Sequence, residues 1–294
     1  MCTCSAMFRF TKAILPFCIL WTLAACQTIS LEEEDIAPEK PNGNLVVSIS
    51  QLEQTPFSSI TRSDQADFCN RLNFAIYNPD GSRVKQTNQL LNEAGFGTAA
   101  FQLDEGTYQL VVVAHSSDGN PTMTDPSKIR FTNAQGFTDT FLYNDTIAIG
   151  AEPKTRTLTL HRITALCRFV IEGDIPANVS KMRFYYTGGS GAFNAATGLG
   201  SVNSKQDLKF DVTSGQREFD LYTFLHNQEG TIHLKVTALD ASGNEILLRE
   251  FDVSLTQNTI TRYFGDFFGG GDFKTSMIDI NLNTDWDSEI KITF

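Results

Sequence analysis

Several kinds of side chain are scarce in this chain of 294 residues. It contains four His, five Met and two Trp, and its 23 Lys and Arg are outnumbered by 34 Asp and Glu, for a net charge of −11. Because phosphate binding needs a surplus of basic side chains on one face, we exclude nucleic acid as a partner. The shortage of His leaves few groups for metal binding or proton transfer, so we expect no cofactor and no enzymatic activity.

The apolar run near the N-terminus is too short to cross a membrane. It covers 13 residues, Ala13–Ala25, whereas a bilayer core needs about 20. Its length and the basic residues before it are typical of a secretory signal peptide. The run ends in Leu23-Ala-Ala-Cys26, which resembles the bacterial lipobox. We predict a lipoprotein signal peptide over residues 1–25 and a diacylglycerol-modified Cys26; an ordinary signal peptide with an incidental cysteine is the alternative.

Residues 26–44 are predicted to form a short acidic tether. Four consecutive acids, Glu32–Asp35, lie close behind Cys26, and prolines follow at positions 38 and 41. The acidic run resembles the surface-export signal of Bacteroidetes lipoproteins. A solvated spacer that like-charge repulsion extends is the other interpretation, and both can hold together. We therefore expect a lipid anchor in the outer membrane and exposure at the cell surface.

Cysteine usage leaves two thiols for the folded part of the chain. Of the six cysteines, Cys69 and Cys167 are the two that follow Cys26. A disulfide between them is permitted in an oxidising cell envelope. Two unpaired, buried cysteines are the alternative, and the sequence leaves both readings open.

The pattern after the tether is that of antiparallel strands, with short apolar alternations of period two between turn residues. Residues 45–49 open this pattern, and residues 72–76 form the next strand. The tight-turn sequence Asn78-Pro-Asp-Gly81 predicts a hairpin between that strand and residues 82–89, because Pro presets φ and Asp-Gly suits the turn.

A second hairpin is predicted from residues 99–103 and 107–114, which flank Asp104-Glu-Gly106 in the same way. The later strand contains an unbroken apolar run, so we expect it to be buried on both faces. Any helix in this half is limited to one or two turns over residues 89–94.

The second half of the chain repeats the pattern. Residues 157–171 form one long alternation that is expected to end one domain and begin the next, and residues 232–239 and 245–255 predict another hairpin. No amphipathic helix of three turns is visible. We therefore predict an all-β chain of two tandem antiparallel β-sandwich domains, residues 45–155 and 156–294.

The last residues carry another strand pattern. Ile290, Ile292 and Phe294 alternate with polar residues, so residues 288–294 are expected to form a half-buried strand. In the interpretation we favour, this strand pairs within its own domain. Donation to a neighbouring subunit is the alternative, because an added strand pairs its backbone groups and seats alternate side chains in pockets.

Two segments carry a more specific resemblance. The first, Leu160–Val179, combines Arg162, an alternating strand and an Ile-Pro step, and leads towards a glycine-rich loop. The second, Val253–Phe268, places Asn258-Thr-Ile-Thr and a Gly-x-x-Phe pattern after a strand. Together with the lipobox, these segments resemble fimbrial lipoproteins of the FimB type in the fimbrillin superfamily of Bacteroidetes. Gln257 departs from the pattern, since an Arg is more usual there.

The resemblance implies two transthyretin-like β-sandwiches on a lipid anchor, placed at the base of a fimbria or used as an accessory subunit. Fimbrial stalk subunits would be the protein partners, and the role would be fimbria assembly and cell adhesion. The position, at the base or at a tip, stays open, and a host-surface or glycan ligand is a further candidate. Asp145-Thr146-Ile147 also resembles the O-glycosylation acceptor of Bacteroidetes, with an unmodified loop as the alternative.

Two other functions compete with the fimbrial one. A surface lipoprotein that binds carbohydrate would use sandwich domains in the same way, but sugar sites are usually built from exposed Trp and Tyr, and a single Trp follows the leader. A glycan hydrolase could use Asp285 and Asp287, which an extended segment places on one side beside Trp286. Two acids so close together are more often turn residues.

The remaining candidate sites lack the spacing that their chemistry needs. The sequence Gly188-Gly-Ser-Gly-Ala192, which contains Ser190, has an Ala in place of the final Gly of a nucleophile elbow. We therefore interpret this segment as part of a flexible glycine-rich connection over residues 188–200. The run Gly265–Asp272 lacks the Lys-Ser/Thr pair of a phosphate loop, and Asp240–Glu245 lacks the spacing of a calcium loop. The histidines have no second ligand at metal-binding spacing; they are His115, His161, His226 and His233.

Overall fold

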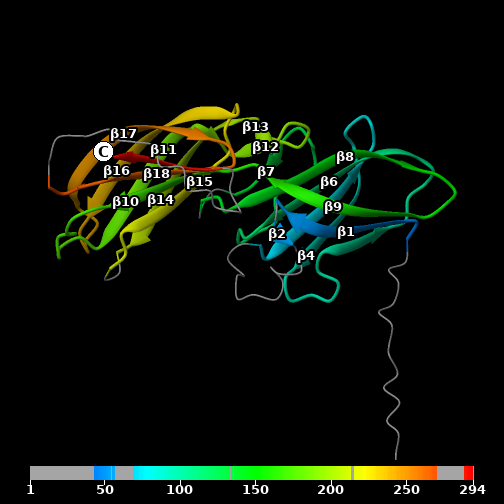
Figure 1. The fold of residues 1–294 in the computed structure, drawn as a ribbon, viewed down its shortest axis with the longest axis horizontal. Helices are drawn as coiled ribbons and strands as arrows, with labels where there is room; N and C mark the ends of the chain where they lie inside the picture. The colour runs from blue at the N-terminus through cyan, green and yellow to red at the C-terminus, as the bar shows by residue number, and fades with distance from the viewer. Residues whose placement is uncertain are drawn as a thin grey trace, which may run out of the picture. The chain divides into compact units, whose positions relative to one another are not determined.

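The computed structural model describes residues 43–53, 55–56, 69–132, 134, 136–212, 215–269 and 288–293. All of them belong to one compact unit, Pro41–Phe294. Every helix or strand in these ranges is a β-strand, which confirms the all-β prediction. The strands, drawn in Figure 1, are β1 (Leu45–Leu52), β2 (Thr55–Pro56), β3 (Arg71–Tyr77), β4 (Arg83–Leu90), β5 (Thr98–Phe101), β6 (Gly106–His115), β7 (Ile129–Arg130), β8 (Thr140–Ile149), β9 (Lys154–Arg162), β10 (Ala165–Ile171), β11 (Lys181–Ser190), β12 (Ala192–Asn194), β13 (Leu199–Gly200), β14 (Asn203–Asp211), β15 (Glu218–Thr223), β16 (Glu229–Leu239), β17 (Glu245–Thr256), β18 (Thr259–Gly265) and β19 (Ser288–Thr293).

The first half of the chain forms an eight-stranded sheet of order β2-β1-β9-β8-β6-β3-β4, in which β5 also pairs with β1 (Figure 1). The strands around β1 and β9 and the strands around β3 and β6 both send alternate side chains into one apolar core. Val47 and Leu158 enter it from β1 and β9, and Phe74 and Val112 enter it from β3 and β6. The core therefore lies between two layers of strands.

Strand β6 is buried on both faces, as its unbroken apolar run predicts. Val112 lies in the core of the eight-stranded sheet, whereas Val111 and Val113 belong to another apolar cluster on the opposite face. All three side chains are 0% exposed.

One of the two hairpins predicted in the first half is confirmed. Strands β3 and β4 pair antiparallel through the Asn78–Gly81 turn, where Gly81 has the positive φ of +84° that such a turn needs. The prediction of the second hairpin is wrong, because β5 pairs with β1 while β6 pairs with β3 and β8. The side-chain amide of Asn44 bonds to both backbone groups of Leu103, which holds β5 beside β1. Residues 104–106 therefore link two layers and do not close a hairpin.

The second half of the chain forms two four-stranded sheets, β15-β10-β18-β19 and β14-β11-β16-β17. Their inner faces share a core rich in Phe, in which the ring of Phe184 lies 5.4 Å from Phe169 and 5.2 Å from Phe219 between centroids. The predicted hairpin of β16 and β17 is confirmed, and its turn is held by Asp240 Oδ1, which accepts the backbone N–H groups of Ser242 and Asn244 at 2.8 Å.

The glycine-rich segment after residue 188 is not a flexible loop. Strand β11 continues to Ser190, with a bulge in its pairing to β14 between Tyr186 and Gly189. Gly188 lies in this bulge with φ of +93°, and a Cβ there would sit 2.3 Å from the carbonyl oxygen of Thr231. Glycine is required at this position because of the close approach of β16, so the residue type indicates packing and not mobility.

The long alternation over residues 157–171 is divided between two strands. β9 pairs with β1 and β8 although it extends past residue 155, and β10 begins the next sheet at Ala165. The division into domains over residues 45–155 and 156–294 stays a prediction. At the other end, β19 pairs in parallel with β18 of the same chain, with Ile260 opposite Glu289, as in the favoured interpretation of that strand.

A further apolar cluster contains residues from both halves of the chain. Phe131 and Phe137 precede β8, and both pack against Phe224 near the end of β15, with ring centroids 6.0 and 5.0 Å apart. Strand β7 also pairs with β12, so that Ile129 lies opposite Phe193. These contacts join segments that are far apart in the sequence, and they were not predicted from it.

Candidate functional site

A buried ion pair lies where β9 ends. Arg162, the last residue of β9, donates from Nε to Asp139 Oδ1 at 2.7 Å and from Nη2 to Oδ2 at 2.8 Å. The two side chains are 0% and 5% exposed. The hydroxyl of Thr164 donates to the same carboxylate at 3.1 Å, and the guanidinium lies 4.6 Å from the centroid of the Phe141 ring. Burial raises the pKa of Asp139, and the bidentate contact with the guanidinium opposes that rise.

The same guanidinium reaches the turn between β17 and β18. Arg162 Nη1 donates to Asn258 Oδ1 at 3.1 Å. Asn258 has a left-handed φ of +56°, a conformation that Asn adopts more readily than most residues. Beside it, Gln257 Nε2 donates to the carbonyl oxygens of Ile163 and Gly198, each at 3.0 Å. Gln257 thus supplies a hydrogen-bond donor at the position where the resemblance leads us to expect an Arg.

We call Asp139, Arg162, Thr164, Gln257 and Asn258 the junction network. It brings together the two segments that resemble the fimbrial family, which are also neighbours in the sheet because β10 and β18 pair in parallel. Its charges are buried and bind each other, so the arrangement does not suit proton transfer or ligand exchange. The network can instead hold β9, β10 and the β17–β18 turn in a fixed relation.

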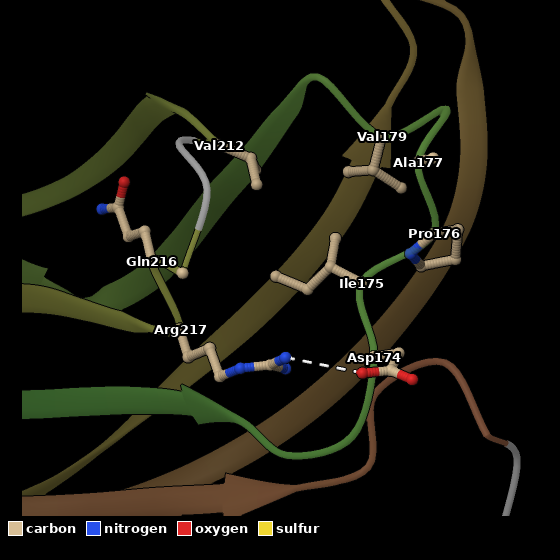
Figure 2. A pocket seen from close by; sticks show the side chains of 9 residues that line it. Asp174, Ile175, Pro176, Ala177, Val179, Val212, Gln216 and Arg217 are labelled. Carbon is tan, nitrogen blue, oxygen red and sulfur yellow. Dashed lines mark ion pairs between the residues drawn. The ribbon is translucent and has the colours of Figure 1, made fainter.

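A cleft of about 300 Å³ opens beyond the end of β10. Ile175, Val179 and Val212 give it apolar lining, and Figure 2 shows Arg217 facing Asp174 across it. Arg217 Nη2 lies 3.6 Å from Asp174 Oδ1, and the Asp174 side chain is fully exposed. An ion pair of this kind contributes little to stability. The cleft can receive an apolar side chain, and its lining has no nucleophile beside a base.

A neutral histidine forms the centre of a buried polar cluster under the loop that follows β6. His115 is 0% exposed, and its Nδ1 accepts the backbone N–H of Ser117 at 3.1 Å. The proton must therefore be on Nε2, which lies 2.8 Å from Asn73 Oδ1. The Asn73 amide donates in turn to Asn88 at 2.8 Å and to Asn120 at 3.0 Å. Burial, with a smaller contribution from Arg71, lowers the pKa of His115 to about 3.

We expect this cluster to make the folded chain sensitive to acid. The unfolded chain takes up a proton at His115 near pH 6.5, whereas the folded chain stays neutral there until about pH 3. The folded state therefore binds fewer protons between these values, so the stabilisation is complete above pH 6.5 and is lost as the pH falls. The free energy of unfolding should decrease by up to about 1.4 kcal/mol per pH unit through this window.

Urea unfolding between pH 4 and 7 measures this slope. In His115→Gln the slope should be shallower by up to about 1.4 kcal/mol per pH unit, because Gln does not titrate. An unchanged slope in His115→Gln would contradict the assignment of a neutral, buried imidazole.

Several residues predicted from the sequence lie outside the described part of the chain. These are Cys26, the acidic tether as far as residue 42, and the Asp285, Trp286 and Asp287 cluster. Thr146 is described and exposed; it belongs to β8 and not to a loop, opposite Gln109 of β6. Cys69 and Cys167 are both free and buried, and burial raises the pKa of each thiol, to about 12 for Cys69.

The other predicted candidates are not brought together into a site. Ser190 is 1% exposed, and its hydroxyl bonds to Ala192 and Val202, so it is not placed as a nucleophile. His161 and His233 lie beside Glu53 and Asp252 on exposed strand faces. In the part of the chain that the structure describes, no group of three or more His, Cys, Asp and Glu side chains could hold a metal ion.

Asp139 is the member of the junction network that the sequence reasoning missed. It stands between Thr138 and Thr140 just before a strand, which is an ordinary place for an exposed turn residue. A lone acid before an apolar strand is a weak signal, and the partner Arg lies 23 positions away.

The described residues contain no helix long and apolar enough to cross a bilayer.

Comparison with known proteins gives one family. The model of the fimbrillin-A associated anchor proteins Mfa1 and Mfa2 matches residues 40–293. No curated protein matches the chain. Among solved structures, a candidate polysaccharide-binding protein from Bacteroides thetaiotaomicron VPI-5482 is 16% identical with a TM-score of 0.45, over 71% of this chain and 79% of that one.

Two further solved structures are similar at the same level. A candidate adhesin from Bacteroides ovatus ATCC 8483 is 15% identical with a TM-score of 0.49, over 71% of this chain and 81% of that chain. The fimbrial anchor protein Mfa2 from Porphyromonas gingivalis is 13% identical with a TM-score of 0.42, over 70% and 80% of the two chains.

Proposed function

Because the chain belongs to the family of fimbrillin-A associated anchor proteins, we propose that it is a lipid-anchored fimbrial subunit of the outer membrane, acting as an anchor or an accessory component. The extent of the family match carries this proposal, since residues 40–293 include every strand from β1 to β19. The role of such a family is structural rather than catalytic, and it implies fimbrial subunits as partners.

The finer parts of the proposal rest on the sequence. Acylation at Cys26 attaches the chain to the outer membrane, and the acids Glu32–Asp35 direct it to the cell surface. The buried junction network supports a mechanical role, because a bidentate ion pair out of contact with water resists rearrangement of the strands that carry it. A chain anchored in the outer membrane and exposed at the cell surface takes part in fimbria assembly and cell adhesion.

Fimbriae sheared from the native host test the proposed function. We expect the chain to co-purify with the stalk subunits, and we expect deletion of its gene to release fimbriae into the medium if it is an anchor. For an accessory subunit, the fimbriae of the deletion strain stay on the cell but change in length or number. Fimbriae that lack the chain, together with an unaltered deletion strain, would contradict both roles.

We also propose that Thr146 carries an O-linked glycan. Its side chain is exposed on β8, and the preceding Asp145 is held in place: Oδ1 accepts the backbone N–H of Thr146 at 2.7 Å, and Oδ2 accepts the hydroxyl of Tyr143 at 3.2 Å. The intact mass of the chain from the same fimbrial preparation decides the point. A glycan gives extra mass that Thr146→Ala removes, and a mass equal to that of the bare lipoprotein rules the modification out.

A further inference from the structure

Three strand pairings in this fold are parallel. They join β1 with β9, β10 with β18, and β18 with β19. Every other pairing between the described strands is antiparallel. Antiparallel pairs can be closed by a short turn, whereas a parallel pair always needs a long connection. The three parallel pairs are therefore not by-products of local turns.

The parallel pairs form a series between the two ends of the folded unit. β1 is its first strand and pairs with β9, which leads through Ile163 and Thr164 directly into β10. β10 pairs with β18, and β18 pairs with β19, the last strand. A pull on the chain before Leu45 and after Thr293 is therefore carried by the three parallel pairs, one after another.

The direction of these pairs decides how they respond to such a pull. In the first pair Leu45 lies opposite Lys154 and Leu52 lies opposite Leu160, so both strands begin at the same end. Tension draws β1 towards its N-terminus and β9 towards its C-terminus, and the strands can separate only by sliding along each other. The hydrogen bonds run across this direction and are loaded together. β10, β18 and β19 are arranged in the same way.

Side chains of β1 also oppose sliding. Val47 and Leu52 lie in the apolar core with 0% exposure, and a shift of one residue would turn them to the outer face of the sheet. The hydroxyl of Ser50 donates to the carbonyl oxygen of Leu158 on β9 at 3.0 Å, at the point where the register of the pair shifts. Such an irregularity pins the register of two strands. The first pair is thus held by backbone bonds, by burial and by a side-chain bond.

We propose that the three parallel pairs act as a tension clamp, which keeps the chain folded when it is pulled between its N-terminal anchor and its C-terminal strand. The proposal rests on the proposed function, in which the N-terminal side is fixed to the outer membrane and a fimbria pulls on the rest of the chain. Resistance to such a pull is a matter of the unfolding rate and not of the equilibrium stability. Loading many hydrogen bonds together, in place of one at a time, lowers that rate.

Single-molecule force spectroscopy of residues 26–294 tests the clamp. Made without the leader, the chain offers the free thiol of Cys26 as one handle and a C-terminal tag as the other; Cys69 and Cys167 are buried. For comparison, a variant with Cys26→Ala is held through Arg71→Cys and Leu90→Cys, at the open end of the β3–β4 hairpin, where antiparallel pairs open one by one. We expect the end-to-end unfolding force to be at least about twofold higher at the same pulling speed.

Two substitutions on β1 separate the parallel pair from its neighbour. Ser50→Ala removes the bond to Leu158 on β9 and should speed end-to-end unfolding under a constant force about fivefold. Ser48→Ala is the matched control, because the Ser48 hydroxyl lies 3.3 Å from that of Thr98 on β5. Among the described strands β5 pairs with β1 alone and can follow it, so this variant should change the rate less than about twofold.

The melting temperature of each variant shows that it is folded. An end-to-end force no higher than the force on the hairpin, or equal effects of Ser50→Ala and Ser48→Ala on the rate, would overturn the clamp. Both measurements use the purified chain, so failure here leaves the proposed function untouched. Absence of the chain from fimbriae, with an unaltered deletion strain, would contradict the proposed function whatever the unfolding force.

Discussion

Arg162→Met is expected to lower the free energy of unfolding by about 3–5 kcal/mol. The substitution removes the guanidinium that donates two bonds to Asp139 and leaves a carboxylate that is 5% exposed without its counter-ion. A buried charge without a counter-ion is strongly destabilising, because the bond that remains from Thr164 does not replace its lost hydration. Urea or calorimetric unfolding measures the loss, which should far exceed that of an exposed ion pair.

Arg183→Met is the matched control for Arg162→Met. Arg183 binds Asp207 in the same two-pronged way, at 2.7 and 2.6 Å, but both side chains are about two-fifths exposed. Loss of that pair should change stability by about 0–1 kcal/mol. The double variant Arg162→Met/Asp139→Leu should recover part of the stability, since no buried charge is left. A loss below about 1 kcal/mol in Arg162→Met would show that the junction network contributes little.

Cys26→Ala is expected to move the chain from the membrane fraction to the soluble fraction almost completely. The sequence Leu23-Ala-Ala-Cys26 supplies the acylated residue of the predicted anchor, and burial of an acyl chain contributes about 0.8 kcal/mol per CH₂ group. Detergent partitioning and immunoblotting of cell fractions measure the change.

Cys18→Ala is the matched control for the anchor, because Cys18 lies in the same apolar leader but outside the lipobox. This variant should stay in the membrane fraction like the parent. Retention of Cys26→Ala in the membrane to the same extent as Cys18→Ala would show that the anchor lies elsewhere, and it would remove lipidation from the proposed function without affecting membership of the fimbrial family.

The strands themselves were largely predictable because their signals are local. Alternation with a period of two depends on which side of one strand is covered, and turn residues act within four positions of each other. The hairpins of β3 with β4 and of β16 with β17 were therefore predicted from the Asn78–Gly81 turn and from the Asp240–Asn244 segment. The family resemblance was also visible in the sequence, since its segments are strand-and-turn signatures.

The turn at Asp104–Gly106 shows the limit of local signals. Its composition is that of a hairpin, yet the strands before and after it pair with different partners in different layers. A turn sequence fixes how sharply the chain bends and does not choose which strand lies alongside. The same limit applies to the glycine-rich segment after residue 188, where the close approach of β16, and not local mobility, requires glycine.

The amino-acid sequence by itself determined that this protein is built of strands, where several of them begin, two of the turns that close hairpins, and which family it resembles. The tertiary structure alone decided the parallel pairing of β1 with β9, the contact of β7 with β12 and the partner of Arg162. The physical reason is that alternation records burial but not the identity of the neighbour. Pairing between distant strands is chosen by how all layers pack at once, and that choice leaves no mark in any single segment.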